Sequence, residues 1–207
     1  MDTCSFSKSQ WLYEDQLVLD LHIENEELPQ VELYDCTILN AKLSGAILQR
    51  WVFENCVFKD SDLSNLHFEN CIFEECLFED SRLIGTQWKQ SSERHLQLKF
   101  NRCDLSLANL NGLNLQKVSF TSSNCREVDF SHSKLMESHF LDTHVHQAVF
   151  EGADLSLAHL SGAIGEQFDL STTTLAHATI SMNTAVRLIE QMGLKVDTTS
   201  LHIRDAD

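Results

Sequence analysis

The chain has 207 residues, of which 43% are hydrophobic, so its composition is that of a globular domain and excludes a disordered segment. Its formal net charge of −16 opposes direct binding to nucleic acid or to an anionic membrane and favours a basic partner. No apolar run approaches the ~18 residues that cross a bilayer, no leader sequence is visible, and the seven cysteines show no CxxC spacing; we therefore expect a cytoplasmic protein without disulfides.

Residues 1–30 are the least regular part of the chain. Leu17, Leu19, Leu21 and Ile23 occupy alternate positions, a spacing typical of a strand. This segment is predicted to form an irregular first coil or cap.

A period of five governs residues 31–182. Between Leu33 and Trp88, and in a shifted frame between Phe100 and Ile180, every fifth residue is apolar except Gly165. The residue two before each apolar centre is mostly small, and residues two apart on an extended chain point the same way. Each unit is therefore predicted to be a short extended face with two inward side chains.

Turns must connect these faces, and the chain has few glycines for them. Five of its seven glycines lie two residues after an apolar centre, where a corner needs a relaxed backbone: Gly45, Gly85, Gly112, Gly152 and Gly162.

The units ENCVF, DSDLS, GADLS, RCDLS and LANLN resemble the A(D/N)LXX pattern of pentapeptide repeat proteins. The resemblance implies an all-β solenoid, a right-handed quadrilateral β-helix in which four units make one coil of twenty residues. Residues twenty apart then stack, giving about seven coils and a rod of roughly 35 Å. The predicted stacks are Phe100, Phe120, Phe140, Leu160 and Ile180; Leu110, Phe130, Phe150 and Leu170; Leu33, Phe53 and Phe73; and the core cysteines Cys36, Cys56 and Cys76.

The frame shifts by two residues between Trp88 and Phe100. The intervening residues 89–97 (KQSSERHLQ) are polar, locally basic and without the repeat, so we predict a loop that projects from a corner. It is either a tolerated insertion or a partner-binding loop, because loops on rigid scaffolds often bind. The candidate binding residues are Lys89, Gln90, Ser91, Ser92, Glu93, Arg94 and His95.

The period changes to that of a helix within residues 183–197. Asn183 is predicted to cap the helix and Gly193 to end it, and Leu194 and Val196 alternate like a short strand. This segment either caps the solenoid or joins two copies in a dimer. The residues of the predicted dimer contact are Ala185, Leu188, Ile189, Met192 and Leu194.

The stretch TAVRLIEQMGLKV resembles the helix-plus-strand ending of the Qnr and Mfp subgroup, in which the segment joins two rods end to end. The resemblance thus implies a homodimer, and it places residues 89–97 where Qnr proteins carry their larger loop. No counterpart of their smaller, earlier loop is present, since the repeat is unbroken from Leu33 to Trp88. Residues 198–207 are predicted to be a mobile tail.

No catalytic motif is visible. A β-helix filled with Phe and Leu has no interior pocket, so no enzyme activity, cofactor or metal is expected. His144 and His146 flank Val145 on the surface, and His139 and His159 stack by the twenty-residue rule. We interpret these histidines as solvated surface, with a weak metal site as the alternative.

The outward acids are the remaining feature. Like charges stacked one strand apart cost stability, so a row of them suggests a use, although solubility alone is the other explanation. The predicted acidic face comprises Glu54, Asp60, Asp62, Glu69, Glu74, Glu75, Glu79 and Asp80.

The resemblance and the acidic rod together favour a mimic of DNA that binds DNA gyrase or topoisomerase IV. Such a protein would protect the enzyme from quinolones or from a natural topoisomerase toxin, and so give antibiotic resistance. The alternative is a non-enzymatic scaffolding protein with another partner.

Overall fold

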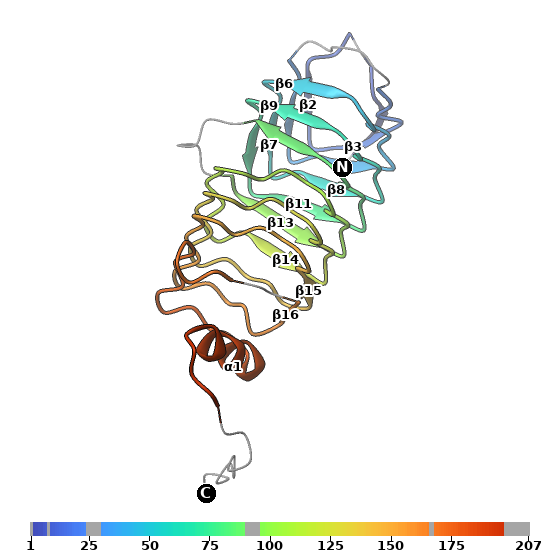
Figure 1. The fold of residues 1–207 in the computed structure, drawn as a ribbon. Coiled ribbons are helices and arrows are strands. Elements are labelled where there is room, and N and C mark those ends of the chain that lie inside the picture. Colours follow the sequence, from blue (N-terminus) through green and yellow to red (C-terminus); the bar gives the residue numbers. More distant parts are fainter. Residues whose placement is uncertain (1, 8, 24–29, 90–95, 166–167, 197–207) are drawn as a thin grey trace, which may run out of the picture.

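The computed structural model is a stack of coils with the single helix α1 (Met182–Gln191) at its C-terminal end (Figure 1). It describes residues 2–7, 9–23, 30–89, 96–165 and 168–196. The projecting residues 90–95 of the predicted loop and the predicted tail at 198–207 lie outside this range. The solenoid has about seven coils, which confirms the quadrilateral β-helix with a C-terminal helix.

Each coil has four faces, and strands on one face pair in parallel with the strand above and below. We number the faces in chain order. Face 1 holds β2 (Leu12–Glu14), β4 (Glu32–Tyr34), β7 (Val52–Glu54) and β10 (Ile72–Glu74). Face 2 holds β1 (Asp2–Ser5), β3 (Gln16–Leu19), β5 (Thr37–Leu39), β8 (Val57–Lys59), β11 (Cys76–Glu79), β13 (Leu98–Asn101) and β14 (Ser119–Thr121). Face 3 is a ladder of single bridges that ends in β15 (Thr143–His144) and β16 (Ala163–Ile164), and face 4 holds β6 (Ile47–Gln49), β9 (His67–Glu69) and β12 (Gln87–Lys89).

The register changes at the predicted frame shift. Partners lie twenty residues apart from β2 and β3 up to β11, as in the pair Phe58 and Phe78, whereas β1 pairs with β3 at a spacing of fourteen, as in Asp2 and Gln16. From β11 to β13 the spacing is twenty-two, because Phe78 pairs with Phe100. The insertion therefore leaves the stack at the end of face 4 and returns at Leu96, whose N–H donates to the carbonyl of Asn114 on face 1.

The corners use left-handed backbone at ordinary residues. Gly45 and Gly85 have φ of 72° and 67°, as the glycine spacing predicts. Many corners instead hold Asp or Asn at positive φ, since short polar side chains tolerate this region. Asp35, Asp60 and Asp80 are examples, with φ of 52°, 51° and 48°. Some surface acids are therefore explained by the positive φ that their corner positions require.

Stacked phenylalanines fill the axis of the solenoid. On face 2 the ring centroids are 4.7 Å apart between Phe58 and Phe78 and 5.2 Å between Phe78 and Phe100.

The predicted stack on face 4 is wrong at its last member. Leu170 is 42% exposed, and Phe168 packs against Phe150 in its place, with centroids 5.2 Å apart.

The cysteines are reduced, as expected. Cys36, Cys56 and Cys76 stack as buried residues on the inner side of face 2, and all seven cysteines are free. The Cys56 thiol donates to the carbonyl of Leu33 (3.3 Å), which satisfies a polar group inside the core.

The predicted strand at Leu17 to Ile23 is formed only in part, because β3 ends at Leu19 and a corner follows. Val18 is fully buried, whereas its neighbours Leu17 and Leu19 are only half-buried. Leu21 is buried because Asp20, at φ 57°, turns the corner and restores the inward direction. The five-residue pattern therefore extends below residue 31, and β1, β2 and β3 continue the same sheets.

Helix α1 begins one residue before the predicted cap. Ser181, not Asn183, is the N-cap, and its side chain accepts a hydrogen bond from the N–H of Thr184 at 3.1 Å. Gly193 follows the helix at φ 81°, as predicted. The predicted strand at Leu194 and Val196 is not formed within the described residues, which end at 196.

Candidate interaction surfaces

Among the described residues the interior is a continuous apolar core. The buried polar side chains of the described residues are Ser and Thr, and those of Ser61 and Ser81 donate to backbone carbonyls within the same turn. No group of three or more His, Cys, Asp or Glu gathers in these residues as metal ligands would. The surface is therefore where function must be sought.

The eight acids predicted as one acidic face lie on all four sides of the rod. Glu54, Glu74 and the corner residue Glu75 belong to face 1, and Glu69 belongs to face 4. Glu79 lies on face 2, with Asp60 and Asp80 at its corner, and Asp62 lies on face 3.

Face 1 carries carboxylates in every coil from β2 to β10. Glu14, Tyr34, Glu54 and Glu74 follow one another in register. No basic side chain in the described residues forms an ion pair with these groups. The face 1 carboxylates, as we call them below, are Glu14, Asp15, Glu32, Asp35, Glu54, Glu74 and Glu75.

The environment of Tyr34 reflects this concentration of negative charge. Its hydroxyl donates to Glu32 at 3.1 Å. Burial, followed by the carboxylates of Glu32 and Glu54, raises the pKa of Tyr34. Face 1 is thus a local source of negative potential.

Two of the predicted acids on face 2, Glu79 and Asp80, are paired with bases. The Arg102 guanidinium donates to Asp80 at 2.6 Å and to Glu79 at 2.9 Å, and Lys59 donates to Glu79 at 3.0 Å. These hydrogen bonds lower the pKa of Asp80 and of Glu79. The twenty-residue rule does not predict this cluster, because the insertion of two residues moves Arg102 above Asp80.

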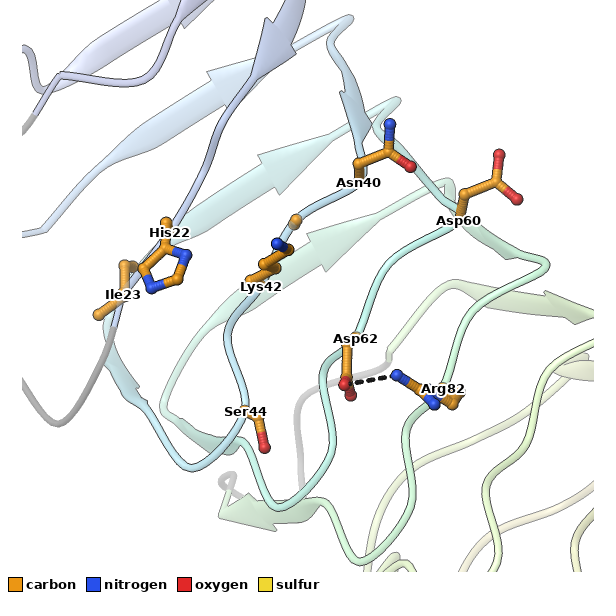
Figure 2. Close-up of a pocket in the computed structure, with 9 residues that line it drawn as sticks. His22, Ile23, Asn40, Lys42, Ser44, Asp60, Asp62 and Arg82 are labelled. Carbon is orange, nitrogen blue, oxygen red and sulfur yellow. Dashed lines mark hydrogen bonds and ion pairs between the residues drawn. The ribbon is translucent and has the colours of Figure 1, made fainter.

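Face 3 alternates in charge from one coil to the next. His22, Lys42, Asp62 and Arg82 form successive bridges, and Figure 2 shows them lining a shallow surface depression of about 590 Å³. Burial raises the pKa of Asp62, but hydrogen bonds from Ser64, and after them the contact with Arg82, which donates to Asp62 at 2.7 Å, bring it below its ordinary value. Face 3 is therefore charge-compensated, unlike face 1.

The two ends of the predicted loop lie next to face 1. Lys89 ends β12 on face 4, and Leu96 resumes the stack above β10, the last strand of face 1. The other candidate residues of the loop, 90–95, lie outside the described range. The face 1 carboxylates and the base of the loop thus adjoin.

The residues predicted for the dimer contact divide between two sides of α1. Leu188 is buried in the continuous core, to which Leu175 and Ala178 also pack. Met192 and Leu194 are 67% and 58% exposed, and Ala185 and Ile189 are partly exposed. The helix therefore caps the solenoid with one side and presents apolar side chains on the other. Met182, which the sequence analysis omitted, is 64% exposed and extends this apolar surface.

The histidines lie as predicted. The rings of His139 and His159 stack with centroids 4.5 Å apart, and His144 and His146 are exposed with centroids 6.3 Å apart.

Two family models match the repeats: "Pentapeptide repeats (9 copies)" over residues 38–82 and "Pentapeptide repeat region" over residues 97–180. The chain belongs to the pentapeptide repeat family. The gap between the two matches contains the predicted insertion, where the structure changes register. No helix within the described residues of this pentapeptide repeat protein is long and apolar enough to cross a membrane.

Several solved pentapeptide repeat structures are similar. A trypsin-treated form of QnrB1, described as a plasmid-mediated fluoroquinolone resistance protein, has 18% identity and a TM-score of 0.47, covering 86% of this chain and 99% of its own. Full-length QnrB1 has 18% identity and a TM-score of 0.42, covering 85% and 99%. HetL, described as involved in heterocyst differentiation regulation in the cyanobacterium Nostoc sp., has 15% identity and a TM-score of 0.37, covering 82% and 85%. No curated protein matches the chain in sequence. The family assignment therefore rests on the repeat models and the coil geometry.

Proposed function

We propose that this protein binds a type II topoisomerase, DNA gyrase or topoisomerase IV, and protects it from quinolones or from a natural topoisomerase toxin. The observation that carries the proposal is the row of carboxylates on face 1, which Glu54 and Glu74 illustrate and with which no basic side chain of the described residues forms an ion pair. Stacked like charges cost stability, and no described base offsets that cost. A solid rod with such a face suits a cationic groove that ordinarily holds DNA.

The position of the insertion supports the same surface. Residues 89–97 leave the stack at the end of face 4 and re-enter it above face 1, so the loop and the carboxylates can contact one partner together. In this proposal the basic residues Lys89, Arg94 and His95 contact the topoisomerase outside its DNA groove.

The exposed side of α1 supports a homodimer. Met182, Met192 and Leu194 are large apolar residues exposed at the end of a rod, where a second copy can cover them around a two-fold axis. Two rods joined this way would present about 70 Å of length to a long groove. The resemblance of TAVRLIEQMGLKV to the Qnr and Mfp ending favours the same arrangement.

A supercoiling assay tests the function. Purified gyrase with a quinolone should recover supercoiling activity when the full chain is added, and the amount of drug-stabilised DNA cleavage should fall. Topoisomerase IV is assayed in parallel by decatenation. If the protein neither binds, inhibits nor rescues either enzyme, the proposal fails, and a scaffolding role with another partner takes its place.

Deletion of residues 90–95 isolates the loop. The described coils on either side pair with each other through β11 and β13, so we expect the variant to keep the thermal unfolding of the full chain. We expect it to bind the enzyme but to protect less well. Undiminished protection would make the insertion a tolerated one.

A further inference from the structure

The His139–His159 pair is a surface feature that the proposed function does not use. Both imidazoles stand on face 2 in neighbouring coils, and their rings are nearly parallel, at 10°. Each residue is held by the ladder: the N–H of His139 donates to Val118 at 2.9 Å, and that of His159 donates to Ser138 at 2.8 Å. The backbone therefore fixes the spacing of the two residues on the face, and both side chains are exposed.

The stacked geometry does not suit a metal. The lone pairs of an imidazole lie in the plane of its ring, so two nearly parallel stacked rings direct them side by side rather than at one point. No third His, Cys, Asp or Glu within the described residues joins the pair as a ligand. The stack suits two rings of which at most one is charged.

The groups around the pair do little to offset a second proton. Ser119 and Thr179 continue its row on face 2 below and above. At the neighbouring corners the titratable groups are Glu137, His177 and Asp142. Glu137 already pairs with Lys117 at 3.8 Å.

We propose that the His139–His159 stack is a pH-sensitive contact that holds the last coils together at neutral pH and loosens them when both rings are protonated. Two charged rings at 4.5 Å repel, and a fixed backbone leaves only ring rotation or opening of the coil as relief. The coil that opens carries Thr179, two residues before the cap of α1. The proposal is independent of topoisomerase binding.

The pKa of His139 supports this direction. Burial, and then the neighbouring His159, lowers the pKa of His139 against the opposing effect of Glu137. Because a lowered pKa in the folded state means that the unfolded state binds more protons, stability is lost as pH falls below the ordinary value of 6.5.

The first test follows the ring protons of His139 by NMR as the pH is lowered. We expect a pKa below the ordinary value in the full chain and a return toward it in His159→Gln. An unchanged titration of His139 in His159→Gln would overturn the proposal. Should the variant misfold, the full chain alone decides: an ordinary, single-step titration of His139 would also overturn it.

The second test compares thermal unfolding at about pH 7.5 and about pH 5. The Tm of the full chain should fall by about 3 °C more on acidification than the Tm of the variant His139→Gln/His159→Gln. The control variant His144→Gln/His146→Gln removes two exposed histidines whose rings are 6.3 Å apart and should behave as the full chain. An equal fall in Tm for the full chain and for both variants would contradict the proposed pH sensitivity of the His139–His159 contact.

Discussion

At the scale of single residues, position in the coil decides what each side chain does. A phenylalanine at a unit centre stacks on the phenylalanine one coil away, and an acid at a corner can be there for its backbone. Acidic residues at different positions in the coil therefore have different structural roles. Asp80 turns a corner at φ 48° and is paired with Arg102, whereas Glu74 on face 1 makes no turn and pairs with no base among the described residues.

The central phenylalanine of face 2 gives the first prediction. Phe78 is fully buried between Phe58 and Phe100, so Phe78→Ala should lower the free energy of unfolding by about 3–5 kcal/mol. Urea unfolding measures the change. Leu141→Ala, at a site 56% exposed, is the control and should change stability by less than about 0.5 kcal/mol. A comparable loss in both variants would contradict the assignment of the core.

The contacts of Arg102 with Asp80 and Glu79 predict how the stability of the fold changes in acid. The pKa values of Asp80 and Glu79 lie below their ordinary values of 3.8 and 4.5, first because of hydrogen bonds to basic side chains. A carboxyl group with a lowered pKa stabilises the fold at pH values above its ordinary pKa. This stabilisation is lost as the pH falls through the lowered pKa of the folded state. Arg102→Ala should therefore reduce the loss of stability between about pH 5 and pH 3.

Denaturant unfolding as a function of pH checks this prediction. Arg126→Ala, which removes an exposed arginine that no described carboxylate pairs with, is the matched control and should follow the full chain. An Arg102→Ala profile that also follows the full chain would show that the cluster contributes nothing measurable.

At the scale of elements, α1 has two unlike sides. Its inner side closes the core through Leu188, whereas Met182 at its start and Met192 directly after its end are exposed. The sequence located the helix through its apolar spacing, but spacing alone cannot separate a capping side from a contact side. The N-cap was misassigned for a similar reason, since Ser181 and Asn183 are both good capping residues and only the path of the last coil selects Ser181.

Two substitutions test the capping contact and the proposed dimer contact separately. Met192→Asp should leave the thermal unfolding transition almost unchanged and convert the proposed dimer to a monomer in light scattering. Leu188→Asp buries a charge at the end of the core and should destabilise the fold by several kcal/mol. A dimeric Met192→Asp together with a dimeric Met182→Asp would show that α1 is only a cap.

At the scale of the whole molecule, the period of five determined the architecture. It located the faces, the Phe stacks, the reduced cysteines and the register change before Phe100. The end of the repeat was less predictable, because Phe168 replaces Leu170 in an irregular coil.

The distribution of charge was also only partly predictable. The twenty-residue rule places Glu54 beneath Glu74, as observed, and would have added Glu14 had residues 1–30 been treated as coils. It could not reveal the neutralising role of Arg102, because that contact arises across the two-residue insertion and depends on side-chain reach.

The most direct test of the account is the affinity of purified gyrase for three proteins at about 0.15 M salt. Glu32→Gln/Glu54→Gln/Glu74→Gln removes three of the face 1 carboxylates. Glu127→Gln/Asp142→Asn/Glu151→Gln removes three exposed acids on other parts of the rod and so matches the change in net charge. Surface plasmon resonance should show affinity reduced about tenfold or more for the face 1 variant and nearly unchanged for the control. Equal affinity of both variants and the full chain would contradict face 1 as the binding surface.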